Sequence, residues 1–211
     1  NGKNVLVEKP FTTSSKEAVE LTELAEKKKL ILMVGFTFLY NSAVRKVKEI
    51  IDSGELGDVY YVYSQRLNLG IVRKDVNVWW NLAPHDVSIV KYWLPQKVKS
   101  VSGFGVSFIQ SGVEDVVSAN IKFENGTAAV IHVSWLDPHK IRQITIVGSK
   151  KMVIYDDVSS DMKVQVYDKG IDKFDDFQTF GQFQLIHRAG DIFIPKIDFK
   201  EPLEIEATHF V

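Results

Sequence analysis

The chain has 211 residues, 45% of them hydrophobic and 25% charged, which is enough for one or two packed cores. Its 26 basic and 27 acidic residues leave a formal net charge of −1, so no broad attraction to nucleic acid or to an anionic membrane is expected. No apolar run approaches the roughly 20 residues that a membrane-spanning helix needs. Because there is no cysteine, disulfides and thiolate chemistry are excluded, and we expect a cytoplasmic protein.

Residues 1–35 have the pattern strand, helix, strand. The apolar run Val5–Val7 is followed by a turn, and Ser14 and Glu17 have the spacing of a capping box at the start of an amphipathic helix. A second apolar run, Leu30–Val34, stops at Gly35. A parallel βαβ unit of this size cannot bury both faces of its sheet, so we expect it to be the tail of a larger domain.

An ionisable triplet, Glu8-Lys9-Pro10, stands where the first strand meets its turn. In open α/β sheets, ligands bind beyond the carboxyl ends of the strands. Lys9 is therefore expected at a binding edge. The alternative is an ordinary solvated lysine at a strand end.

From residue 36 onward strands dominate. Asn41 or Ser42 is expected to cap a helix that ends at Gly54. Asn125-Gly126 predicts a β-hairpin with a type I′ turn. The aromatic residues of the strands, Trp135 and Tyr155 among them, are expected to fill a core or an oligomer interface. The expected strands are Val59 to Leu67, Val98 to Ile109, Val116 to Phe123, Thr127 to Trp135, Ile141 to Val147 and Met162 to Tyr167.

One helix interrupts these strands and carries a second chemical signal. In the segment from Trp79 to Asp86, Pro84 suits the first turn of a helix, which would place His85 at the helix N-terminus. The helix dipole there disfavours imidazolium, so a neutral imidazole that accepts a proton near neutral pH is expected. The alternative is a histidine that only caps its helix or packs under Trp80.

These motifs together resemble the Gfo/Idh/MocA family of NAD(P)-dependent oxidoreductases. The resemblance rests on NVLVEKP, the helix and LILMVGF that follow, YNSAVRKVKEII and NLAPHD, and it extends through the whole chain. It implies the C-terminal part of a dinucleotide-binding Rossmann domain in residues 1–35. It also implies an α+β substrate-binding and oligomerisation domain in residues 36–211, with a large, mostly antiparallel open sheet covered by helices on one face.

The resemblance also implies roles for particular residues. Lys9 would lie near the nicotinamide and the substrate hydroxyl, His85 would be the acid/base, and Asn81 would orient the hydroxyl. The cofactor, NAD or NADP, would be contacted by the Glu8, Lys9 and Pro10 triplet. Tyr40 and Trp80 adjoin the motifs and are expected to bind substrate, since sugar rings stack on such side chains.

Three positions depart from the family pattern. Many relatives have an aspartate four residues before the motif histidine, where this chain has Asn81, and an amide cannot hold a proton or a negative charge. Phe36 and Leu39 stand where many members have histidine and arginine. Sugar-acid recognition through that arginine is therefore not expected.

The glycine-rich phosphate-binding turn GxGxxG does not occur in the sequence. We therefore expect the chain to be an internal part of a longer protein and, as it stands, to bind dinucleotide poorly or not at all.

The function expected from this pattern is hydride transfer between a nicotinamide cofactor and a secondary hydroxyl of a sugar, cyclic polyol or nucleotide sugar. One alternative is a sensor or regulator of the same fold that binds dinucleotide or sugar without turnover, and another is an oligomerisation scaffold. We expect a homodimer or homotetramer built through the sheet, and no nucleic-acid or membrane partner. No metal site is expected, because no two histidines have a paired ligand spacing.

Overall fold

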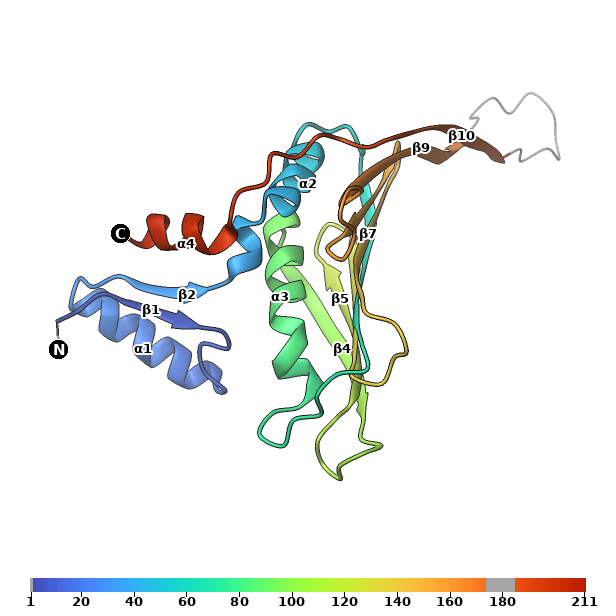
Figure 1. The fold of residues 1–211 in the computed structure, drawn as a ribbon. Coiled ribbons are helices and arrows are strands. Elements are labelled where there is room, and N and C mark those ends of the chain that lie inside the picture. Colours follow the sequence, from blue (N-terminus) through green and yellow to red (C-terminus); the bar gives the residue numbers. More distant parts are fainter. Residues whose placement is uncertain (1, 174–184) are drawn as a thin grey trace.

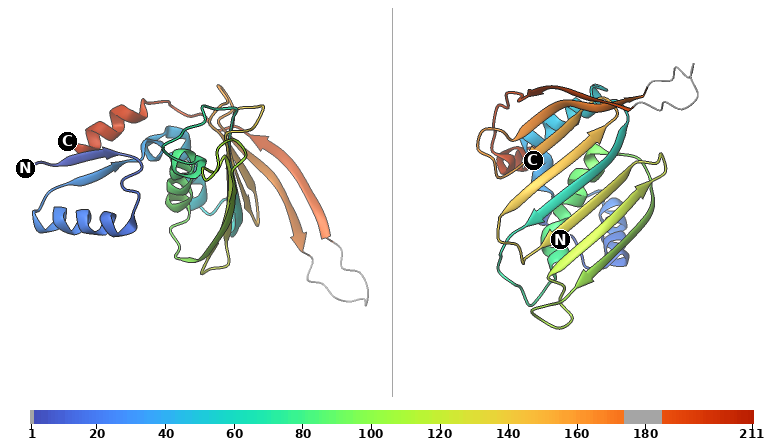
Figure 2. Two further views of the ribbon diagram at one scale, coloured as in Figure 1. Left: turned by 90° about the horizontal axis from the view of Figure 1, so that it is seen from below. Right: turned by 90° about the vertical axis from the view of Figure 1, so that its right-hand side faces the viewer.

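The structure is a computed structural model that describes residues 2–173 and 185–211. The chain begins with β1 (Val5–Glu8), α1 (Ser15–Lys27) and β2 (Leu32–Gly35), and the two strands pair in parallel. A short 3-10 helix, η1 (Thr37–Tyr40), leads out of this unit. The C-terminal helix α4 (Pro202–Phe210) returns to the side of the β1–β2 pair opposite α1 (Figures 1 and 2). The predicted βαβ unit is confirmed.

The rest of the chain forms an eight-stranded sheet in the order β10-β9-β8-β7-β3-β6-β5-β4. β3 and β6 pair in parallel, and every other neighbouring pair is antiparallel. Helices α2 (Ser42–Asp52) and α3 (Val78–Trp93) cover one face (Figure 1). This is the predicted open sheet. The strands are β3 (Val59–Leu67), β4 (Val98–Val106), β5 (Val116–Phe123), β6 (Ala128–Ser134), β7 (Ile141–Gly148), β8 (Met152–Asp156), β9 (Val164–Lys173) and β10 (Leu185–Phe193).

The core lies between these two helices and the sheet. Ile89 and Trp93 of α3 pack with sheet residues such as Ile146, and all three side chains are fully buried. The Trp93 indole N–H donates to the carbonyl oxygen of Val44 at 2.9 Å, so a buried polar group is satisfied where the two helices meet. In the part of the chain that the structure describes, no helix has the length and apolar character needed to cross a membrane.

Local signals in the sequence had mixed outcomes. Asn41 caps α2, because its side-chain oxygen accepts from the amides of Ala43 and Val44. The predicted capping box at the start of α1 is wrong, since Ser14 makes no side-chain capping bond. The hairpin between β5 and β6 is confirmed, but its turn is not type I′. Only Gly126 has positive φ there, as in a three-residue loop that ends in a left-handed glycine.

Strand boundaries were correct in the centre of the sheet and poor at its margins. β3 and β5 match the predicted ranges. The strand expected to reach Ile109 ends at Val106, and β8 and β10 were not predicted. β10 is rich in polar and small residues, including Arg188 and Gly190, so its strand character depends on pairing with β9.

The helix that carries the histidine motif begins earlier than predicted. Asn77 is its N-cap, with its side-chain oxygen accepting from the amide of Trp80 at 3.1 Å, and the first helical residue is Val78. Pro84 therefore lies inside α3, where it has no N–H for the carbonyl of Trp80. His85 sits in the middle of the helix. The prediction that the dipole of a helix N-terminus keeps its imidazole neutral is wrong.

Candidate active site

Lys9 extends from the carboxyl end of β1 toward α3. Its Nζ donates to the backbone oxygen of Asn81 at 2.8 Å, and the side-chain oxygen of Asn81 accepts from the indole N–H of Trp135 at 3.2 Å. The βαβ unit, α3 and the end of β6 therefore meet at Asn81. Burial lowers the pKa of Lys9, the charge of Arg66 lowers it further, and Glu8 opposes the shift. Lys9 is thus a half-buried ammonium group that releases its proton more easily than a surface lysine.

His85 is neutral at this site for a reason that only the tertiary structure supplies. Its pKa is lowered to about 3, first by burial and then by the positive charges of Arg66, Lys9 and Arg142. Its Nδ1 is buried and has no hydrogen-bond partner among the described residues. The expected neutral imidazole is therefore present, but its low pKa makes it a weaker base than expected.

Behind His85 lies a buried ionic cluster. Asp86 accepts from Ser64 Oγ at 2.7 Å and from Arg66 Nε at 2.6 Å, and all three residues are at most 4% exposed. The Arg66 guanidinium carbon lies 4.8 Å from the ring centre of Phe38, and that ring is 4.8 Å from the imidazole of His85. A buried charge is tolerated only when it is paired, and here both oxygens of Asp86 are occupied.

Four residues of this site were not predicted from the sequence, namely Arg66, Ser64, Phe38 and Arg142. Trp135 was expected only as a core or interface residue. A signal for two of them was available. Ser64 and Arg66 alternate along β3 with outward residues, on the same face as the apolar Val62. Polar residues on the inward face of a strand indicate a buried network.

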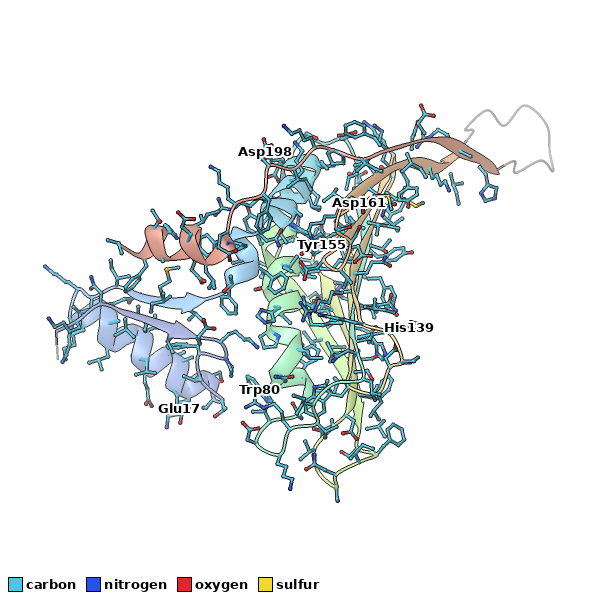
Figure 3. The ribbon with its side chains drawn as sticks, viewed as in Figure 1. Glu17, Trp80, His139, Tyr155, Asp161 and Asp198 are labelled. Atoms are coloured by element: carbon cyan, nitrogen blue, oxygen red, sulfur yellow. The ribbon has the colours of Figure 1, made fainter. Side chains whose placement is uncertain are left out.

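The other predicted residues lie around this cluster. Glu8 is exposed and pairs with Gly35 of β2. The carboxylates of Glu8 and Glu206 both lie beside the position that a β-carbon would occupy at Gly35. Pro10 and Trp80 line one apolar groove of about 630 Å³ between the βαβ unit and α3. Figure 3 shows Trp80 near the start of α3 on the side of this unit.

Tyr40 lies elsewhere. It is 8% exposed, its hydroxyl is 2.7 Å from Nδ1 of His209, and it lines a separate groove of about 970 Å³ between α2 and α4. The structure does not bring it to Lys9 and His85. Within residues 2–173 and 185–211, no group of three or more His, Cys, Asp or Glu side chains could hold a metal ion.

Two family profiles match the chain. The profile of the GFO/IDH/MocA C-terminal domain matches residues 44–154, more than half of the chain, and that of the oxidoreductase family NAD-binding Rossmann fold matches residues 1–36. The chain belongs to the Gfo/Idh/MocA oxidoreductase family.

Named relatives agree with this assignment. The scyllo-inositol 2-dehydrogenase (NAD(+)) of Bacillus subtilis is 28% identical over 193 residues, 85% of this chain and 56% of that protein. The structure of UDP-N-acetylglucosamine 3-dehydrogenase from Acidithiobacillus ferrooxidans superposes with a TM-score of 0.74 at 22% identity, covering 99% of this chain and 62% of that one. An inositol dehydrogenase homologue from Azotobacter vinelandii, complexed with NADH and myo-inositol, gives a TM-score of 0.69 at 20% identity, covering 79% and 47%. The chain spans about half the length of the curated relatives it matches.

In this member of the Gfo/Idh/MocA family, the part of the Rossmann domain that is present includes Lys9 but not the glycine-rich turn. Lys9 offers a cation at the carboxyl end of β1, the edge where open α/β sheets bind ligands. The sequence contains no GxGxxG turn to hold a pyrophosphate. The described residues therefore include a cation at this edge but no turn that would hold the phosphates of a dinucleotide.

Proposed function

We propose that this chain is part of an NAD(P)-dependent dehydrogenase that acts on a secondary hydroxyl of a sugar, cyclic polyol or nucleotide sugar. The observation that carries the proposal is the bond from Lys9 Nζ to Asn81, beside a neutral His85. This arrangement gathers a cation, a neutral imidazole and an amide where a carbinol could lie.

The bound nicotinamide would accept the hydride that leaves the carbinol carbon. Lys9 in its neutral form would take the hydroxyl proton, and the ammonium so formed would stabilise the negative charge on the substrate oxygen. Trp135 donates to the amide oxygen of Asn81 and so orients the amide, and the NH₂ of that amide would donate to the hydroxyl oxygen. Asn81 would thus orient the hydroxyl without taking its proton.

Lys9 and His85 differ in how readily they accept a proton. The pKa of Lys9 is lowered, so its neutral form is more accessible than that of a surface lysine. The pKa of His85 is about 3, so its imidazole accepts a hydrogen bond readily and a full proton reluctantly. These directions favour Lys9 over His85 as the proton acceptor.

Names of relatives support the substrate class. Two are inositol 2-dehydrogenases and one solved relative is a UDP-N-acetylglucosamine 3-dehydrogenase, so the reacting centre in each is a ring carbinol. A sensor that binds sugar or dinucleotide without turnover would not need Lys9 and His85 together. An oligomerisation scaffold would need neither residue.

Replacing Lys9 tests the proposal. In the longer protein that contains this chain with its complete Rossmann domain, Lys9→Met should lower kcat/KM by about 10²-fold or more, because the charge at the substrate oxygen is lost. The exposed Lys16→Met on α1 is the matched control and should keep wild-type turnover. Unchanged turnover in Lys9→Met would remove Lys9 from the chemistry. Absence of any dehydrogenase activity in the wild type, across inositols and nucleotide sugars, would favour the sensor.

A further inference from the structure

Arg66 has contacts that go beyond neutralising a buried carboxylate. Its Nε and Nη2 reach the two oxygens of Asp86 at 2.6 and 3.4 Å, and Ser64 holds the second of these oxygens. Asp86 of α3, itself held by Ser64 of β3, therefore fixes the orientation of the guanidinium plane. The guanidinium group also packs against the ring of Phe38 in η1.

Phe38 in turn contacts the imidazole of His85. The ring centres are 4.8 Å apart at an interplanar angle of 53°. No hydrogen bond among the described residues holds the buried Nδ1 of His85, so the ring is not fixed from that nitrogen. The ring of Phe38 packs against this imidazole and limits the space in which it can turn.

We propose that Arg66 is a positioning residue, which orients His85 through the ring of Phe38 and is itself held in place by Asp86. The role rests on the proposed function only where catalysis is concerned. The geometry of the chain Asp86, Arg66, Phe38 and His85 can be tested without substrate.

Arg66 and Arg142 are two cations near His85 that can be compared. The charged groups around His85 come from four elements: Lys9 from the end of β1, Arg66 from β3, its partner Asp86 from α3, and Arg142 from β7. Arg142 lies directly across the strand pair from Arg66 and is paired with Asp157 at 3.4 Å. Both arginines lower the pKa of His85, but the recorded contact with Phe38 is made by Arg66. A variant of Arg142 therefore changes charge while leaving the packing of Phe38 intact.

The test is NMR on this chain with isotope-labelled histidine, with His85 assigned from the signal lost in His85→Gln. Four variants separate packing from charge. Phe38→Leu removes the ring, and Arg66→Lys keeps the charge but not the planar guanidinium. Arg66→Met with Asp86→Asn removes both charges so that no buried ion is left unpaired. Arg142→Gln is the control.

We expect a single set of imidazole ring shifts for His85 in the wild type and its loss in Phe38→Leu, Arg66→Lys and the double variant. In Arg66→Lys and the double variant, the nuclear Overhauser contacts between the rings of Phe38 and His85 should also be lost. Arg142→Gln should raise the pKa of His85 without disturbing those contacts. If Arg66→Lys, or the double variant in a folded state, keeps wild-type ring contacts and a single imidazole conformation, the positioning role is refuted.

A second readout uses the longer protein with its complete Rossmann domain. Arg66→Lys should lower kcat by about 10-fold with KM unchanged, since a misplaced imidazole beside the reacting hydroxyl slows chemistry without weakening binding. A rise in KM at constant kcat would instead make Arg66 a substrate-binding residue and overturn the inference. If the protein proves not to be a dehydrogenase, the ring contacts still decide whether Arg66 positions His85.

Discussion

At the residue scale, the candidate site contains more hydrogen-bond donors than acceptors. Lys9, the amide NH₂ of Asn81 and the guanidinium of Arg66 all donate, and Asp86 is already occupied by its partners. His85 is the neutral acceptor. Keeping His85 neutral lowers the free energy of unfolding in mild acid, because the same side chain becomes protonated when the chain unfolds.

The first prediction concerns this loss of stability. The pKa of His85 is about 3 in the folded protein against 6.5 as its ordinary value, so both states are neutral above pH 6.5 and the charge does not affect stability there. Between pH 6.5 and 3 only the unfolded state binds the proton, so stability falls as the pH falls. We expect His85→Gln to lose less stability over this range than the wild type, by on the order of 4 to 5 kcal/mol at the acid limit.

Urea unfolding measured at intervals across the acid range decides this prediction. His139→Gln is the control, because His139 is exposed in the loop before β7 (Figure 3). That variant should follow the wild-type curve. Parallel curves for His85→Gln and the wild type would mean that His85 titrates normally in the folded protein.

The second prediction concerns the departure at Asn81. A carboxylate at this position could still accept from the indole of Trp135, and its negative charge would lie close to His85 and Lys9. Asn81→Asp should therefore raise the pKa of both groups, since a nearby anion favours their charged forms. NMR titration of His85 in Asn81→Asp and in wild-type protein measures the shift, and an equal or lower pKa in the variant would contradict it.

At the element scale, α3 supplies most of the site. One side of this helix packs into the core through Ala83, Ile89 and Trp93, and Asn81 and His85 lie on a neighbouring side one turn apart. Pro84 leaves the carbonyl of Trp80 without its helical partner at this level of the helix. β1 and β3 bring Lys9 and Arg66 to the same part of α3, where Lys9 bonds to Asn81 and Arg66 to Asp86.

The third prediction compares two helix caps. Asn41 accepts two backbone amides at the start of α2, a helix with four buried residues, whereas Ser14 makes no capping bond at the start of α1, which has none. Asn41→Ala should therefore cost about 1 kcal/mol of stability, and Ser14→Ala should change it by less than about 0.5 kcal/mol. Chemical denaturation of both variants is the measurement. Equal losses would show that the capping bonds do not account for the difference.

At the scale of the whole molecule, the sheet has one covered and one open face. Val62 points toward the helices and is fully buried, while the neighbouring Tyr61 is 45% exposed. Phe104 on the edge strand β4 is 62% exposed. The open face is less apolar than expected, because residues such as Ser118 and His132, whose side chains bond at 2.7 Å, lie among the aromatics.

The fourth prediction is that this open face joins copies of the chain into a dimer or tetramer. Exposed aromatics spread over one sheet face favour association over a monomer. Light scattering at micromolar concentration should give a mass above 24.0 kDa that falls with dilution, and Tyr61→Lys should shift the equilibrium toward monomer. Lys16→Glu on α1, away from the sheet, is the control. A concentration-independent monomer would rule out the sheet interface.

The sequence by itself determined the βαβ unit, the strands in the centre of the sheet, the capping residue Asn41, and the two motifs that contain Lys9 and His85. These features depend on local patterns, such as apolar periodicity and turn residues, that short segments carry by themselves. The family resemblance followed from the same segments.

Only the tertiary structure decided how the site works. The neutrality of His85 comes from burial and from cations on β1, β3 and β7, which lie far apart in the sequence. The same holds for the bond of Trp135 to Asn81 and for the placement of Tyr40 beside His209, away from Lys9. Burial and long-range charge depend on which segments pack together, and local patterns do not specify this.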